Sequence, residues 1–322
     1  MLSNLVTALL VSAALFGTAS AASPSFSDQP ITLVVPHAAG TGVDTIARAL
    51  APQLGKSLGT SIIVENRVGA NGAIGSLFVV RSKPDGRTLL LNANPPFVTY
   101  PMTQDPPLYD AERDFSPIAM VGSTPMALVV SAESGIDGMD RFVEYVKSHP
   151  ALASYASPGP GSAGHLAMER LAAAKNMKIQ HVLYKSTPQS LSDVTAGHIL
   201  SAFVSITSAS PLLDSGRLRA IAVGSTKRLS PYPNVPTLKE ATGIQDFEGT
   251  VWYGVLGPKG MSAEAVRTIY EAVAQAHAAP EFQSVMLKQS IHPELQTPDG
   301  FKAKLHSDTA LSKALLGNIS GK

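Results

Sequence analysis

Short apolar runs alternate with amphipathic segments along most of this chain. The runs end at turn residues, as strands buried on both faces do, and the segments between them repeat apolar residues at helical spacing. About ten strands alternating with helices predict an α/β fold with parallel strand pairs. The expected strands cover 31–36, 61–65, 88–92, 118–122, 126–131, 179–184, 199–206, 218–223 and 251–256. The main expected helices cover 46–58, 74–81, 140–147, 163–175, a segment from 187, 262–278 and a segment from 298.

Two loops rich in small residues connect a predicted strand to a predicted helix. The loop 36–42 follows the first strand, and the loop 157–162 precedes the helix 163–175, which Ser162 can cap. Such a loop directs unpaired backbone N–H groups and the positive end of a helix at one point, where an anion fits. If the two halves of the chain formed two lobes, we expect these loops to face each other.

Several polar residues near these loops are candidates with two possible roles. His37 lies just past a strand end, where it can donate to an anion. Asn94 follows the third strand, in the region where open α/β sheets bind ligands, but it can also cap a turn. Lys185 can pair with a second anionic group or remain a solvated surface residue. Thr41-x-x-Asp44 has the spacing of a capping box, so Asp44 is expected to serve its own helix.

The length and the first residues predict an exported protein of two lobes. Leu5 to Leu15 is apolar, and Ala19-x-Ala21 has the form of a signal-peptidase site, so residues 1–21 are predicted to be a signal peptide. The alternative is a buried helix. Cleavage after Ala21 leaves 322 − 21 = 301 residues, enough for two lobes of roughly 150 each. Trp252 and Tyr253 are expected in the core.

Charge and cysteine content narrow the function. The net charge is +1, with 25 basic and 24 acidic residues and no block of one sign, so a nucleic-acid partner is not expected. The chain has no cysteine, so its stability must come from packing rather than disulfides.

Motifs for cofactors and catalysis are incomplete. Thr45 replaces the last glycine of a dinucleotide-binding G-x-G-x-x-G, and the histidines lack metal-ligand spacing, so neither a cofactor nor a metal is expected. Ser162 could serve as the nucleophile of an exported hydrolase, with His165 one helical turn away. However, Pro160 stands where a nucleophile elbow needs glycine. The hydrolase is therefore the alternative function.

Eight segments carry a more specific resemblance. They are Val35-Pro36-x-x-x-Gly40-x-x-x-Asp44, Val64-Glu65-Asn66-Arg67-x-Gly69-Ala-x-Gly72, Pro84-Asp85-Gly86-x-Thr88-Leu-Leu, Tyr155-Ala-Ser157-x-Gly159-x-Gly161-Ser162 with His165-Leu166, His181-Val-x-Tyr184-Lys185, Leu218-Arg219-Ala-x-Ala222-Val223, Pro233-x-Val235-Pro236-Thr237 and Trp252-Tyr253-Gly254. In this order, they resemble the Bug family of periplasmic solute-binding proteins, the receptors of tripartite tricarboxylate transporters. The resemblance covers essentially the whole mature chain.

The resemblance implies a flytrap of two α/β lobes, each a mostly parallel sheet flanked by helices, that closes on a small carboxylate. The first lobe is expected to comprise 29–126 with 226–322 and the second 127–225, with crossover strands near 126–131 and 218–225. Membrane transporter subunits are the implied partners, and a signalling membrane protein is the alternative. In that family, the two loops bind a carboxylate through backbone amides and bridging water. Carried over to this chain, the predicted ligand contacts are Pro36, His37, Ala38, Ala39, Gly40, Thr41, Gly42, Asn94, Ser157, Gly159, Gly161, Ser162, His165 and Ser205.

Departures from the family pattern bear on the ligand. This chain has His37 where relatives have Phe or Tyr. It also lacks both aspartates of a family strand, one of which would stand at Val204. If that acidic group met an amino group, its loss argues against an amino-acid ligand. We therefore expect a non-amino carboxylate, with aromatic and dicarboxylic acids as candidates.

Overall fold

The structure is a computed structural model that describes residue 26 and residues 29–245, 247, 249–289 and 291–320. The predicted signal peptide, residues 1–21, lies outside the described residues. Among the helices of the described ranges, none has the length and apolar character needed to cross a bilayer.

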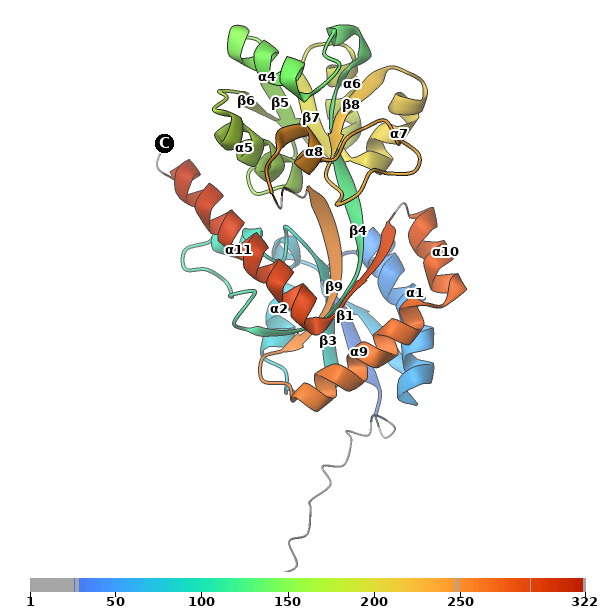
Figure 1. Cartoon of the computed structure of the whole chain (residues 1–322). Helices are drawn as coiled ribbons and strands as arrows, with labels where there is room; N and C mark the ends of the chain where they lie inside the picture. The colour runs from blue at the N-terminus through green and yellow to red at the C-terminus, as the bar shows by residue number, and fades with distance from the viewer. Residues whose placement is uncertain (1–25, 27–28, 246, 248, 290, 321–322) are drawn as a thin grey trace, which may run out of the picture.

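Two groups of strands and helices lie one above the other (Figure 1). In the lower group, β1 (Ile31–Val35) pairs in parallel with β2 (Ile62–Asn66) and β3 (Thr88–Ala93), and β3 pairs antiparallel with β9 (Thr250–Pro258). The same sheet continues through β4 (Phe115–Ser131) to β10 (His292–Gln296). The parallel pairs follow from the predicted strand–helix–strand connections.

Helices cover both faces of this lower sheet. Residues of α1 (Gly42–Leu58), α9 (Ala263–His277) and α10 (Pro280–Lys288) pack on one face, and residues of α2 (Ala73–Val80) and α11 (Pro298–Ser320) pack on the other. Two short elements, η1 (Ala70–Gly72) and α3 (Thr99–Met102), follow β2 and β3. Leu33 faces one helical layer and Val34 the other, which explains why β1 reads as an unbroken apolar run.

The upper group has the same layered plan. β5 (Ser154–Ser157) pairs in parallel with β6 (Gln180–Leu183) and β7 (Ser201–Ser205), and both β7 and β8 (Leu218–Val223) pair antiparallel with β4. Residues of α4 (Met139–Ser148), α5 (Ala163–Lys175) and α8 (Leu238–Thr242) pack on one face of the sheet. Residues of α6 (Thr187–Thr195) and α7 (Ile206–Asp214) pack on the other. The predicted α/β architecture is thus confirmed, with parallel strands in each sheet joined to antiparallel ones.

One strand connects the two sheets. The sequence predicts separate strands at 118–122 and 126–131, but β4 is a single strand of 17 residues. Its first part pairs with β9 and its last part with β7 and β8, so it passes from one sheet to the other near Pro125. Pro125 lacks a backbone N–H, but its extended backbone still continues the strand.

The return crossing lies later in the chain than residues 218–225, where the sequence predicts it. Leu238 of α8 and Phe247 pack with Phe142 and Tyr155 in the core of the upper group. At the crossing, the N–H of Met126 donates to the carbonyl of Gly249 at 2.8 Å. We therefore place the return at residues 249–250 and define lobe 1 as 29–125 with 250–320 and lobe 2 as 126–249.

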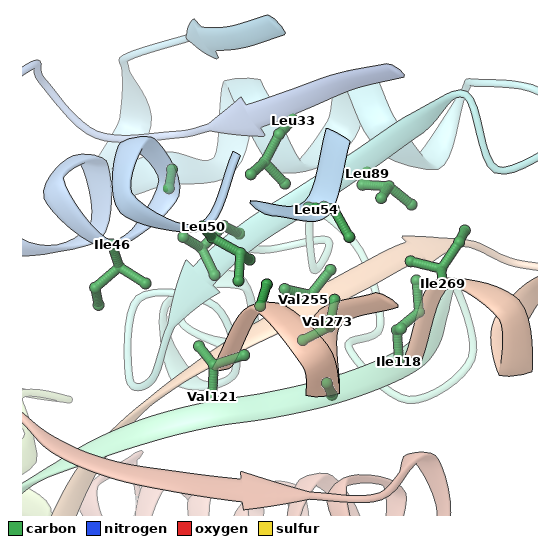
Figure 2. Packing of buried hydrophobic residues seen from close by; sticks show 14 of the residues in the cluster. Leu33, Ile46, Leu50, Leu54, Leu89, Ile118, Val121, Val255, Ile269 and Val273 are labelled. Carbon is green, nitrogen blue, oxygen red and sulfur yellow. The ribbon is translucent and has the colours of Figure 1, made fainter. Parts of the chain in front are cut away.

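The core of lobe 1 shows why its first helix forms. Leu50 and Leu54 of α1 point at the sheet and at α9, and Figure 2 shows them beside Leu33, Val255 and Val273. These side chains are fully buried. Burying an aliphatic side chain of this size stabilises the fold by about 1.5–3 kcal/mol, which makes the helical stripe the main signal for α1.

Candidate functional site

The loop 157–162 has its conformation set by glycines and by a helix cap. Gly159 and Gly161 have φ values of +134° and +78°, a region that side-chain-bearing residues rarely adopt. Ser162 is the N-cap of α5, as predicted: its Oγ accepts the N–H of His165 at 3.4 Å and donates to the carbonyl of Gly159 at 2.7 Å. A Cβ at Gly161 would lie 3.3 Å from Cγ2 of Thr99 in lobe 1. The loop therefore lies against the opposite lobe.

Two cavities lie on either side of this loop. The larger, about 500 Å³, lies between the lobes and is lined from lobe 1 by Asn71, Pro95, Pro96, Tyr100 and Thr103, and from lobe 2 by residues 158–163. The smaller, about 190 Å³, lies in lobe 2 behind the loop, and Ser157, Tyr184 and Phe203 are among its lining residues. Pro158, Ser162 and Ala163 line both cavities, so the loop forms their common wall.

Three helices begin at the smaller cavity. Their N-cap residues Ser162, Ser186 and Ser205 all line it. Each helix N-terminus carries a partial positive charge and unpaired N–H groups, so the three together favour a negative group in this space. The remaining lining is made of hydroxyls and of apolar side chains such as Met126 and Val204.

The first loop is held by Asp44, but not through the predicted capping box. The Oγ1 of Thr41 donates to the carbonyl of Ala38 at 2.8 Å and makes no cap bond with its helix. Instead, Oδ2 of Asp44 accepts the N–H of Gly40 at 2.9 Å. Asp44 thus serves the backbone, as expected, but it occupies an amide that was predicted to meet a ligand.

The Asp44 carboxylate is stabilised by two further partners. Nε of Arg48 lies 2.9 Å from Oδ2, and Nδ2 of Asn66 donates to Oδ1 at 2.9 Å. Burial raises the pKa of this carboxyl, but the hydrogen bonds from Arg48, Gly40 and Asn66 and the Arg48 charge outweigh burial and hold the pKa below its usual range.

His37 lies at the end of the first loop that is nearer the cleft. Its Nε2 is 3.0 Å from Oδ1 of the buried Asn92, and its carbonyl accepts Nδ2 of Asn66 at 2.9 Å. A Cβ at Gly72 would lie 3.7 Å from Cε1 of His37, and the adjacent Asn71 lines the larger cavity. None of the residues 36–42 is among the described residues that line either cavity. Ala38, Ala39 and Gly40 are exposed, so the first loop lies at the surface and outside the lining of both cavities.

Asn94 lies between the lobes, but its side chain bonds to the protein. Its Oδ1 accepts the N–H of Trp252 at 2.7 Å, and its Nδ2 donates to Oδ2 of Asp308 on α11 at 3.3 Å. Trp252 is fully buried, as predicted, and its indole N–H donates to the same carboxylate at 2.6 Å. Lys185 is exposed at the end of β6 and lines neither cavity.

A cluster of aromatic and polar side chains lies beneath the loop 157–162. Oγ of Ser157 is 2.6 Å from Nε2 of His181, and the N–H of Gly161 donates to Nδ1 of His165 at 3.4 Å. The two imidazole rings lie 4.8 Å apart, and the ring of Tyr155 stacks on His181 at 5.0 Å. Burial lowers the pKa of His165, and the neighbouring His181 lowers it further, while Glu169 partly opposes both. Burial likewise lowers the pKa of His181.

The serine–histidine contact in this cluster differs from the one that the hydrolase alternative predicted. Ser162 bonds to the backbone of His165 rather than to its ring, so the predicted serine–histidine approach is not formed. The serine that contacts an imidazole is Ser157, and its partner, His181, was not among the predicted site residues. The signal was present in the motif His181-Val-x-Tyr184-Lys185, but no local pattern connects that strand with Ser157.

Comparison with known proteins agrees with this architecture. The profile of the tripartite tricarboxylate transporter family receptor matches residues 46–317. A UPF0065 protein in the tcbD-tcbE intergenic region of Pseudomonas sp. (strain P51) is 33% identical over 288 residues, 88% of this chain and 84% of that protein. Protein BugT of Bordetella pertussis is 29% identical over 301 residues, 92% of each chain.

Solved structures show the same fold. A TctC solute-binding protein from Polaromonas, without ligand, superposes with a TM-score of 0.82 at 28% identity, covering 91% of this chain and 99% of that one. An R. palustris protein with adipate superposes with a TM-score of 0.68 at 26% identity, covering 90% and 97%. These matches confirm the predicted resemblance, and the chain belongs to the tripartite tricarboxylate transporter family of receptors.

Proposed function

We propose that this protein is an extracytoplasmic receptor that captures a small carboxylate at the loop 157–162, which forms one wall of the cleft between the lobes, and delivers it to the membrane subunits of a tripartite tricarboxylate transporter. Export would follow from the predicted signal peptide. The family supports the receptor role, and the adipate bound to the R. palustris relative supports a carboxylate. Residues 157–162 are the proposed centre of the site.

One observation carries this proposal. The loop 157–162 separates two cavities, and Ser162, Ser186 and Ser205 place three helix N-termini on the smaller one. A carboxylate in this space would gain from the positive ends of α5, α6 and α7 and from backbone N–H groups. Since hydroxyl groups also line it, the anion would exchange bonds with water for bonds with the protein.

The lining of the smaller cavity also bears on the rest of the ligand. Met126, Phe203 and Val204 line this cavity together with Ser157 and Tyr184. An ammonium group would meet partial positive charge there and would lose its hydration, whereas an aromatic or methylene segment would fit the apolar part. We therefore propose a carboxylate without an amino group, and aromatic and dicarboxylic acids are the classes to test first.

The first experiment is a thermal-shift screen of the mature protein with adipate, malate, benzoate and aspartate. The protein is unfolded and refolded beforehand to remove any bound ligand. An acid at 100 times its dissociation constant stabilises the native state by about 2.7 kcal/mol, which raises the melting temperature measurably. A response to benzoate or adipate that exceeds the response to aspartate is expected. A larger response to aspartate would contradict the proposed ligand class.

A matched pair of glycine variants locates the site. Gly161→Ala places a Cβ against Thr99 of the other lobe at a φ of +78°, and Gly197→Ala imposes the same backbone strain at a φ of +76° with nothing within 4 Å. Both variants should lose some stability, but only Gly161→Ala, which strains the loop beside Ser162 of the smaller cavity, should also reduce the shift with the acid. Equal binding by the two variants would place the carboxylate elsewhere.

A further inference from the structure

We propose that His181 is a positioning residue of the ligand site, which turns the hydroxyl proton of Ser157 toward a bound carboxylate. This inference rests on the proposed function, because it requires an anion in the smaller cavity. Ser157 lines that cavity, while its backbone belongs to β5 and its Oγ lies 2.6 Å from Nε2 of His181 on β6.

The hydrogen bonds of Ser157 leave only two arrangements. A hydroxyl has one proton to donate and two lone pairs to accept with. The N–H of Gly159 donates to Oγ at 3.1 Å and uses one lone pair. His181 then takes either the proton, with a bare Nε2, or the second lone pair, with a protonated Nε2.

These two arrangements present opposite groups to a ligand. If Nε2 of His181 accepts the proton, Ser157 offers only a lone pair to the cavity, and a carboxylate oxygen is repelled. If Nε2 carries a proton and donates it, both lone pairs of Oγ are occupied and the Ser157 proton is released. Among the described residues, the other acceptor bonded to this hydroxyl is the carbonyl of Gly159 at 3.4 Å, which is too long for a strong O–H···O bond. A carboxylate in the cavity would therefore select the second arrangement.

The surroundings of His181 hold its ring in place for this role. Tyr155 lies opposite His181 in the β5–β6 pairing and stacks on it, and His165 of α5 contacts its edge. Glu169, also on α5, accepts the hydroxyl of Tyr155 at 2.7 Å. The imidazole is fixed from two sides, so its Nε2 keeps a constant direction toward Ser157.

The test titrates adipate and benzoate into the full mature protein and its variants by calorimetry. His181→Phe keeps a ring but has no donor, and His181→Gln keeps an N–H donor at similar reach. His181→Phe removes the donor that fixes the Ser157 hydroxyl, and because a neutral hydrogen bond contributes about 0.5–1.5 kcal/mol, binding should weaken by about two- to tenfold. His181→Gln should restore most of the affinity.

A double-mutant cycle distinguishes a positioning role of His181 from a general loss of structure in the variant. If His181 acts through Ser157, adding His181→Phe to Ser157→Ala should change the dissociation constant by less than about twofold. The matched control is His149→Phe, because Nδ1 of the exposed His149 lies 2.9 Å from Oγ of Ser148 in a serine–histidine contact outside the site. The control should bind as the wild type does. If His181→Phe does not fold, His181→Asn, whose amide is too short to reach Ser157, replaces it with the same expected loss.

The nitrogen-15 chemical shifts of the imidazoles report which nitrogen carries the proton, and a residue that served only in packing would not change that protonation on ligand binding. In the acid-bound protein, Nε2 of His181 should show the shift of a protonated nitrogen. A bare Nε2, equal binding by His181→Phe and the wild type, or fully additive losses in the cycle would each overturn the positioning role while leaving the receptor function intact. Absence of binding by the refolded wild type to either acid would instead overturn both proposals.

Discussion

Single residues connect the first loop to the rest of lobe 1. Asp44 is almost fully buried, and its carboxylate receives the Gly40 amide, Arg48 and Asn66. Asp44 therefore helps to fix the loop 36–42, together with the bonds from Asn66 to the His37 carbonyl and from Thr41 to the Ala38 carbonyl.

We expect Asp44→Ala to destabilise the protein by about 1–3 kcal/mol, because it removes the hydrogen bonds that the buried carboxylate accepts from Gly40, Arg48 and Asn66. Asp137→Asn, at an exposed position, is the control and should change stability by less than about 0.5 kcal/mol. Urea unfolding at pH 7 measures both. An Asp44→Ala variant as stable as the control would show that these bonds contribute nothing net.

Lowering the pH should remove the contribution of Asp44 to stability. The pKa of Asp44 is lower in the folded protein than its ordinary value of 3.8, so its stabilising contribution is complete above about pH 5 and is lost as the pH falls through the folded pKa. The stability difference between wild type and Asp44→Asn should therefore narrow as the pH is lowered from 5 toward 3. A difference that stays constant over this range would contradict the assignment.

The histidine cluster predicts a second pH dependence, nearer neutrality. The pKa values of His165 and His181 are lower in the folded protein than the ordinary 6.5. The unfolded chain therefore binds more protons, and stability falls as the pH drops below about 6.5. His165→Gln cannot be protonated, so its urea-unfolding stability should depend less on pH between 7.5 and 5 than that of the wild type. At pH 8 the side chain at position 165 is neutral in both the wild type and the variant, so the stability difference measured there reports only the change in packing.

At the scale of elements, local patterns predicted some but not all of the helices that begin at the smaller cavity. The helix 163–175 was predicted with the bounds that α5 has, and its N-cap Ser162 was identified because a serine precedes the helical stripe. The helix α7 was not predicted. Its segment holds two serines, one threonine and an internal Pro211, which weaken the local helical pattern, whereas packing of Ile206 and Ala209 on the sheet stabilises the helix.

Two caps offer a matched test of which helix belongs to the site. Ser162 caps α5 and Ser262 caps α9, and each hydroxyl accepts a backbone N–H three residues later. Replacing either by Ala should cost about 0.5–2 kcal/mol of stability. Only Ser162→Ala should also weaken the calorimetric binding of adipate or benzoate. Equal affinity in the two variants would remove the α5 N-terminus from the site.

At the scale of the whole molecule, the cleft depends on how the two lobes meet. The continuous strand β4 crosses between the lobes, and α11 extends from lobe 1 toward α5 of lobe 2 (Figure 1). Thr99 of α3 and Ser312 of α11 bond at 2.9 Å and fix α11 within lobe 1. These connections leave rotation about the crossing strands as the route by which the larger cavity can close.

Closure can be measured because the chain contains no cysteine. Spin labels on Ile74→Cys in lobe 1 and Leu183→Cys in lobe 2, both at side chains more than half exposed, should move closer together when adipate or benzoate binds. Labels on Ile63→Cys and Ile74→Cys, within lobe 1, should keep their distance. An unchanged distance between the lobes in an acid-bound sample would contradict a flytrap mechanism.

The spacing of apolar residues was sufficient for the α/β class, the order of most elements and the two glycine loops, because strand and helix periodicity depend on neighbours within a few positions. The contact of Ser157 with His181, the amide of Gly40 taken by Asp44 and the return crossing at 249–250 could not be predicted in this way. The imidazole reaches Ser157 only because β5 and β6 pair in parallel, and Ser162, Ser186 and Ser205 meet at one cavity only because three helices start from one sheet edge. Such contacts join distant segments, and their geometry is set by the packing of the sheets rather than by any local pattern.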